Sequence, residues 1–227
     1  MSIFVILQIF LFVLMKTVAY SFFAYICLIT ACLFCILLAD RSKPYIFTKI
    51  GLITTVIADF FLVLLPVQLR VPGMVFFCMT QLAYFMRIYS EDDNRIRKRF
   101  HLILRAVISV LGIVLAYVVL GSRLDILSFL SVFYYANLVL NLIFSYLQFK
   151  KLKTLAIAFS FFILSDTLIG FDNLSSYLLI PRGSVIYIII RHFSSWVMPL
   201  YLIAQTLIAL SLLSRNRAAM NKEQKNI

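Results

Sequence analysis

The sequence predicts an all-α protein: a polytopic membrane helix bundle with about eight transmembrane helices, with a four-plus-four pseudo-repeat as one arrangement. The first observation is composition, because 63% of the 227 residues are hydrophobic and only 13% are charged. Soluble domains lie near one half and one quarter. The second is that apolar runs of membrane-crossing length recur along the chain. The third is that only short polar breaks separate these runs, which leaves no room for a sizeable soluble domain.

Eight apolar runs are the expected helices. They are Ile3–Met15, Thr17–Ala39, Pro44–Leu65, Pro72–Tyr89, His101–Leu120, Leu124–Phe149, Thr154–Phe171 and Ser184–Leu213. The first is short for a bilayer core of about 30 Å, and the last is long and contains Pro199, where we expect a kink. We therefore expect a single integral membrane domain over residues 1–214 and a short basic cytoplasmic tail over residues 215–227.

The basic residues indicate an orientation. A net charge of +12 would suggest nucleic acid in a soluble protein, but here the charges flank the spans and we expect no nucleic-acid partner. When the breaks are assigned alternately to the two membrane faces, 16 of the 21 Lys and Arg residues fall on one face. The positive-inside rule makes that face cytoplasmic. It predicts a multi-pass protein with both termini inside, whereas a seven-span chain would have its N-terminus outside. We expect the membrane to be a bacterial cell membrane, although the rule itself does not identify it.

Two carboxylates lie within the apolar runs. Asp59 is in the third run and Asp166 is in the seventh, and the residues around them are weakly similar. This similarity is the basis for the predicted pseudo-repeat. An Asp inside a membrane costs about 2.5–3.5 kcal/mol on insertion scales, so it needs a partner, a proton or a water-filled cavity. If the two acids converge, they would share a proton, and an acid beside a carboxylate suits general acid–base chemistry. We take both as candidate catalytic residues.

Other polar side chains recur at helical spacing inside the runs. Each is explained either by hydrogen bonding between helices or by a shared polar cavity, and we favour a functional cavity because several helices contribute. Arg191 and His192 could instead pair with an Asp or bind a lipid phosphate. The predicted substrate-binding residues are Gln81, Tyr84, Tyr134, Asn137, Asn141, Arg191, His192, Tyr201 and Gln205.

Other reaction classes lack support. The four cysteines lie in apolar runs and are expected to pack as small hydrophobic residues. No cluster of histidines or cysteines suggests a metal site, so we expect no metal and no cofactor. There is no Gly-x-Ser-x-Gly motif for a serine hydrolase, and we place His101 in a basic loop.

Four stretches together resemble the YhhN-like lysoplasmalogenase family. They are Gly51…Ala58-Asp59-x-x-Leu62, Gly73…Phe77…Gln81-Leu-Ala-Tyr84, Ser165-Asp166-Thr167 followed by Asp172, and Tyr201-x-x-Ala204-Gln205-x-Leu207-Ile208. They follow the order and spacing of the family over most of the chain. Two departures stand out: Ala58 replaces a Gly beside Asp59, and Gln81 stands where the family usually carries a His.

The resemblance implies an eight-span fold and a hydrolase that cleaves the vinyl ether of lysoplasmalogens. The products would be a fatty aldehyde and a glycerophospho-alcohol, with Asp59 and Asp166 as acid and base. Its partners would be a lysophospholipid substrate and membrane lipids. Two alternatives stay open, namely a non-enzymatic lipid-binding relative and a proton-coupled transporter that uses the two acids as relay sites. The sequence does not decide the head group or the oligomeric state.

Overall fold

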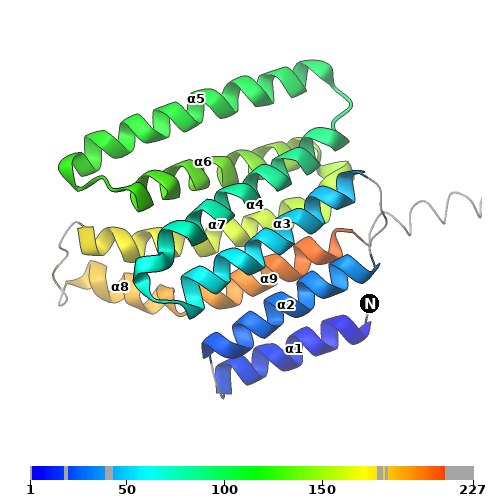
Figure 1. The fold of residues 1–227 in the computed structure, drawn as a ribbon, viewed down its shortest axis with the longest axis horizontal. Coiled ribbons are helices and arrows are strands. Elements are labelled where there is room, and N and C mark those ends of the chain that lie inside the picture. The colour runs from blue at the N-terminus through cyan, green and yellow to red at the C-terminus, as the bar shows by residue number, and fades with distance from the viewer. Residues whose placement is uncertain (1, 18–19, 39–42, 178–180, 182–183, 213–227) are drawn as a thin grey trace, which may run out of the picture.

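The helices of the protein lie side by side in one bundle (Figure 1). The computed structural model describes residues 2–17, 20–38, 43–177, 181 and 184–212, and every regular element within them is helical. In chain order these are α1 (Ser2–Thr17), α2 (Tyr20–Leu38), α3 (Lys43–Asp59), η1 (Phe60–Leu64), η2 (Val67–Leu69), α4 (Arg70–Glu91), α5 (Arg95–Leu120), η3 (Gly121–Arg123), α6 (Ile126–Leu147), α7 (Phe149–Tyr177), α8 (Val185–Ser194) and α9 (Val197–Leu210). The predicted tail, residues 215–227, lies outside the described residues.

Six helical segments within the described residues are long and apolar enough to cross a membrane, which corrects the predicted count of eight. They are Tyr45–Leu64, Arg70–Glu91, Arg95–Leu120, Ile126–Leu147, Phe149–Asn173 and Val185–Leu210. The difference lies at the N-terminus, where the described apolar helices Ile3–Met15 and Ala24–Phe34 are shorter. The 16 residues of α1 rise about 24 Å, which falls short of a core of about 30 Å. The long helices are consistent with a multi-pass membrane protein.

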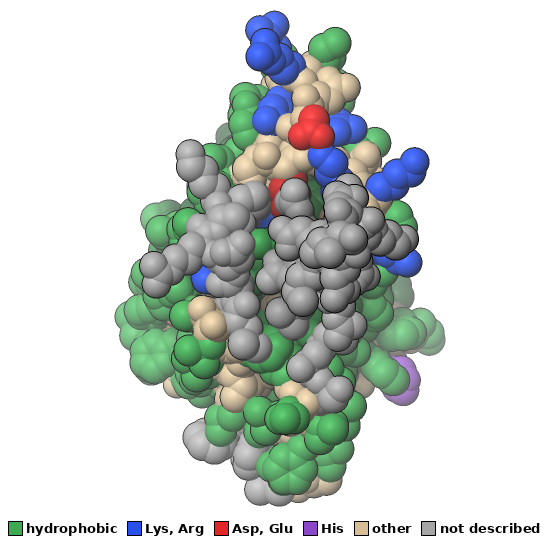
Figure 2. Space-filling view, turned by 90° about the vertical axis from the view of Figure 1, so that its right-hand side faces the viewer, with side chains coloured by type: hydrophobic (Ala, Val, Ile, Leu, Met, Phe, Trp, Pro, Cys, Tyr) green, Lys and Arg blue, Asp and Glu red, His purple; other side chains and the backbone are tan. Residues whose placement is uncertain are grey.

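The chain crosses the bundle back and forth, so that consecutive long helices are antiparallel, while α8 and α9 run on in one direction as a single segment (Figure 1). Packing against one another are α3 and α4, α4 and α6, α6 and α7, and α7 and α9, while α1 and α5 lie at opposite edges (Figure 1). One end of the bundle holds the first turn of α1, the last turn of α9 and the turn between α4 and α5. We call it the basic end, because Lys and Arg side chains gather there (Figure 2).

Two glycines allow α3 and α4 to approach closely. A Cβ atom at Gly51 would lie 2.3 Å from the ring of Tyr84, and one at Gly73 would lie 2.7 Å from the side chain of Leu62 and 3.1 Å from the carbonyl oxygen of Ala58. The close approach beside Asp59 therefore depends on the glycine of the neighbouring helix, and the backbone at Ala58 accommodates a side chain.

Gly51→Ala is expected to destabilise the protein by about 1–3 kcal/mol, because overpacking a filled core forces side chains or backbone to move. Thermal unfolding of the detergent-solubilised protein measures this. The matched control is Gly170→Ala on α7, where a Cβ would meet nothing within 4 Å and where alanine should add up to about 1 kcal/mol of helix propensity. An unchanged unfolding temperature for Gly51→Ala would show that Tyr84 moves aside without cost.

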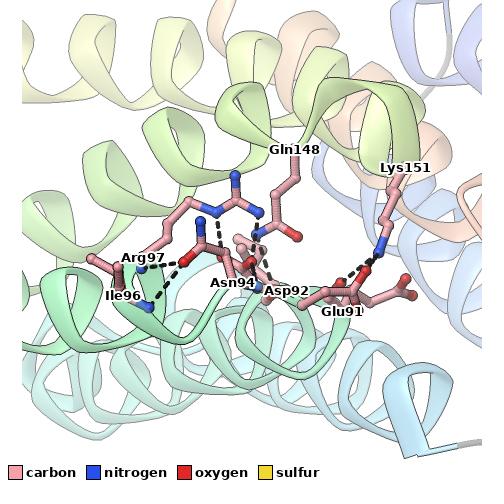
Figure 3. A network of polar contacts seen from close by, with 9 residues as sticks. Glu91, Asp92, Asn94, Ile96, Arg97, Gln148 and Lys151 are labelled. Carbon is pink, nitrogen blue, oxygen red and sulfur yellow. Dashed lines mark hydrogen bonds and ion pairs between the residues drawn. The ribbon is translucent and has the colours of Figure 1, made fainter.

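A polar network fixes the turn between α4 and α5 at the basic end (Figure 3). Asn94 caps α5, since its Oδ1 accepts hydrogen bonds from the backbone N–H groups of Ile96 at 2.9 Å and Arg97 at 3.2 Å. The Arg97 guanidinium donates two hydrogen bonds to the carboxylate of Asp92, both at 2.5 Å. The turn is thereby held in a single direction relative to α5.

The same network joins the turn to the junction of α6 and α7 (Figure 3). Lys151 donates to the carbonyl oxygen of Glu91 at 3.3 Å and forms an ion pair with Asp93. Gln148 donates from Nε2 to the carbonyl oxygen of Ile88 at 3.3 Å. Together these contacts tie the end of α4 to the start of α7.

Asp92→Asn is expected to lower stability by about 1–2 kcal/mol at neutral pH. Burial raises the pKa of Asp92, but hydrogen bonds from Arg97 and from the Asn94 N–H outweigh it, so the pKa lies below its usual value. A lowered pKa stabilises the folded protein at pH values above the usual value of about 3.9, and this is lost as the pH falls through the folded-state pKa. The unfolding temperature of Asp92→Asn should therefore lie well below that of the unmodified protein at pH 7, and the difference should be smaller at pH 3. Asp93→Asn is the control, because the Asp93 side chain is 84% exposed, and a loss of equal size there would contradict the account.

Candidate active site

Asp59 is the last residue of α3, where the helix widens into the π-helical turn η1. Such turns are frequent at functional sites. The Asp59 side chain is buried, and its Oδ2 accepts a hydrogen bond of 2.6 Å from the hydroxyl of Tyr201 on α9. The two residues are 142 positions apart in the chain, so Asp59 and Tyr201 come together only when the helices pack.

Asp166 has a matching arrangement on α7. The hydroxyl of Tyr134, on α6, donates a hydrogen bond to its Oδ2. The flanking residues fix this part of α7, since Ser165 donates to the carbonyl oxygen of Val197 at 3.0 Å and the hydroxyl of Thr167 lies 2.7 Å from that of Tyr135. Asp166 is thus held between α6 and α9.

The two aspartate–tyrosine pairs meet at one place in the bundle. The ring of Phe77, on α4, contacts the rings of Tyr134 and Tyr201, with centroid distances of 5.4 Å and 6.5 Å. The two carboxyl groups and the two tyrosine hydroxyls are close enough for their charges to influence one another. We call Asp59 and Asp166 the acid pair.

A small apolar pocket reaches Asp59 from the side of α2. Asp59, Tyr25 and Tyr201 are its polar lining residues. The apolar ones are Ala24, Leu28, Val63, Met198 and Leu202. The pocket has a volume of only about 10 Å³, room for about one water molecule. Its apolar walls favour a hydrocarbon group over a polar one, because burying apolar surface is the main source of binding free energy for such a group.

Three other predicted site residues belong to a different cluster, centred on Arg105 of α5. The Arg105 guanidinium donates to Oδ1 of Asn137 and, at 2.7 Å, to Oδ1 of Asn141. Asn141 in turn donates from Nδ2 to the side-chain oxygen of Gln81 at 2.9 Å and to its carbonyl oxygen at 3.0 Å. The two asparagines thus join α5, α6 and α4. Of the three predicted site residues on α6, only Tyr134 lies at the acid pair.

His101 lies in α5 and not in a basic loop, which corrects the sequence prediction. The side chain is buried, its ring stacks on Phe144 at 3.5 Å, and its Nε2 lies 3.1 Å from Nη2 of Arg105. Arg105 also lies over the ring of Phe85, 4.2 Å from its centroid. Sequence reasoning missed His101 and Arg105 as members of this cluster, although their spacing of four residues places them on one helix face.

The remaining predicted residues lie apart from the acid pair or are not bonded to it. Tyr84 is fully buried against Gly51 and the ring of Phe159. Arg191 and His192 are exposed at the end of α8, and no ion pair among the described residues includes them. Gln205 is buried on α9 one turn beyond Tyr201, and its amide atoms have no hydrogen-bond partner within the described part of the chain.

Comparison of the sequence with known proteins identifies its family. No curated protein and no solved structure matches it. The model of the YhhN family matches residues 18–212. This range contains both acids, both tyrosines and the Arg105 cluster, and it confirms the resemblance drawn from the four motifs. The chain belongs to the YhhN family.

Proposed function

We propose that the protein is a membrane hydrolase that cleaves the vinyl ether of lysoplasmalogens to a fatty aldehyde and a glycerophospho-alcohol. The observation that supports this most strongly is the acid pair, in which Asp59 and Asp166 each accept a hydrogen bond from a tyrosine and lie within electrostatic reach of each other. Acids placed inside membrane helices are costly and are typical of functional sites.

The chemistry needs a proton donor, a proton acceptor and one water molecule. The donor protonates the vinyl carbon that bears the alkyl chain, and the carbon attached to oxygen becomes an oxocarbenium ion. Water adds to this carbon and gives up a proton, and the resulting hemiacetal separates into aldehyde and alcohol. A carboxylic acid can supply the first proton, and a carboxylate can stabilise the cation and accept the proton from water.

The pocket suggests which acid has which role. An alkyl chain that entered between α2 and α9 and widened this small pocket would lie against Leu28, Met198 and Leu202 and place its first vinyl carbon beside Asp59. That carbon is the one that receives the proton, so we assign Asp59 as the acid. Asp166, which is not among the residues that line this pocket, is then assigned to the oxocarbenium carbon and the attacking water.

The test is release of fatty aldehyde from a lysoplasmalogen by the purified protein in detergent. The saturated alkyl-ether analogue is the negative control, because it lacks the double bond that accepts the proton. Aldehyde from the vinyl ether alone is the expected result. A folded protein that binds the lipid but releases no aldehyde would instead be a non-enzymatic lipid-binding member of the family.

We also propose that the basic end faces the cytoplasm, because Lys and Arg accumulate on the cytoplasmic side of membrane proteins. In a chain freed of its own cysteines, Ser122→Cys, in η3, should react with an impermeant thiol reagent in intact cells. Asp93→Cys, in the exposed turn at the basic end, should react only after the cells are opened. Labelling of Asp93→Cys in intact cells would reverse the orientation.

A further inference from the structure

Gln81 on α4 and Gln205 on α9 lie one helical turn beyond Phe77 and Tyr201, toward the basic end (Figure 1). Helices α4 and α9 both run toward the basic end (Figure 1), and Phe77 on the first contacts Tyr201 on the second. Four residues farther along each helix come Gln81 and Gln205. Four residues advance both helices by about 6 Å on the same side, so the register that joins the two rings also brings the two amides to one level.

These amides are buried with polar atoms unused. Gln81 is 0% exposed and Gln205 is 1% exposed. Within the described residues, Nε2 of Gln81 and both Oε1 and Nε2 of Gln205 have no hydrogen-bond partner. Buried polar groups are nearly always satisfied in native proteins. Three unpaired polar atoms at one level of the bundle therefore indicate that a polar group of a ligand binds to them.

One of the amides is also held in a fixed orientation. Oε1 of Gln81 accepts a hydrogen bond of 2.9 Å from Asn141, and Asn141 itself accepts one of 2.7 Å from Arg105. Since its oxygen is engaged, Gln81 presents its NH₂ group as the open donor. The Arg105 cluster thus acts on the site indirectly, by orienting this amide.

The unpaired donors and acceptor determine which kind of ligand group can bind to them. They comprise two donors, on Gln81 and Gln205, and one acceptor, on Gln205. A hydroxyl group is the complement, because it donates one hydrogen bond and accepts two. The two amides carry no charge, so they favour a neutral group over a phosphate or an ammonium.

We propose that Gln81 and Gln205 bind the free glycerol hydroxyl of a single-chain lipid while its vinyl ether lies at the acid pair. This inference rests on the proposed function. The vinyl carbon that receives the proton and the free glycerol hydroxyl oxygen are five bonds apart, about 6 Å when the chain is extended, which matches the rise of four helical residues between Tyr201 and Gln205. A lipid with a second acyl chain lacks this donor and carries extra bulk, so the two glutamines would select single-chain lipids.

The experiment measures binding of a non-cleavable probe to the purified, detergent-solubilised full chain. The probe is a 1-O-alkyl-2-hydroxy glycerophospholipid, and it is compared with its 2-deoxy analogue. The unmodified protein should bind the hydroxy lipid at least about tenfold more tightly, because a site built to bond a hydroxyl rejects a ligand that lacks it. Gln205→Met should bind both lipids with similar affinity.

A second readout separates binding from a structural role. Replacing an unpartnered buried amide with an apolar side chain of similar shape should stabilise the ligand-free protein, so Gln205→Met should unfold about 2–4 °C higher. Gln205→Glu keeps an acceptor for the hydroxyl and should retain part of the preference. Gln148→Met, at the basic end, is the control and should keep the full preference.

Equal affinity of the unmodified protein for the two lipids would overturn the inference. It would also be overturned if Gln205→Met kept the preference for the hydroxyl but slowed cleavage of a vinyl-ether substrate, because the glutamines would then hold the reacting water. Hydroxyl-dependent binding without any aldehyde release would support this inference and reject the proposed hydrolase alone.

Discussion

Asp59→Asn and Asp166→Asn should each lower vinyl-ether cleavage at least about 100-fold, the lower end for loss of a positioned acid or base. Asparagine has nearly the same size as aspartate and still accepts a hydrogen bond from Tyr201 or Tyr134, so the packing around the acid pair should survive. An amide neither delivers nor takes up a proton at neutral pH. The reaction should therefore fail while the fold is retained.

The double variant should be little worse than either single variant, because residues that act as one unit are not additive. Aldehyde release by purified protein measures the effect, and elution from size-exclusion chromatography verifies the fold. Asp172→Asn, on the exposed end of α7, is the control and should keep full activity. Full activity in a single variant would remove that acid from the mechanism, and loss of the folded peak would make the acid pair a structural feature of the bundle.

The acids themselves could be predicted from the sequence, and their partners could not. Asp59 and Asp166 stand out because an ionisable group in an apolar run is costly without a function or a partner. Tyr134 and Tyr201 were predicted site residues, but nothing in the sequence pairs either with a particular acid. That pairing depends on how α9 meets α3 and how α6 meets α7, which is set by contacts between distant segments.

The steps of three and four residues from Tyr134 to Asn137 and Asn141 place all three on one side of α6, but this spacing does not show that they belong to two different clusters. Helix α6 packs against α4, α5 and α7, so residues three or four positions apart can face different neighbours. Tyr134 bonds to Asp166 of α7, whereas Asn137 bonds to Arg105 of α5. The positive-inside rule treats Arg105 only as one of the charges that flank a membrane span, and this interpretation conceals its buried role.

Arg105→Ala is expected to destabilise the protein by about 2–4 kcal/mol, because Arg105 is 7% exposed and forms the centre of a cluster. It loses hydrogen bonds from a charged donor, which contribute about 1.5–3 kcal/mol each, and its contact with the Phe85 ring. The oxygens of Asn137 and Asn141 would be left without this donor inside the bundle. Thermal unfolding in detergent measures the loss.

Arg105→Lys should recover little of this stability, because one ammonium group does not reproduce the planar fork that reaches both asparagines. The double variant Asn137→Leu with Arg105→Leu should be closer to the unmodified protein than Arg105→Leu alone, since it removes donor and acceptor together. Full recovery by lysine would show that the charge alone stabilises the cluster. In that case the fixed orientation of Asn141, and with it that of Gln81, would no longer depend on the geometry of the guanidinium.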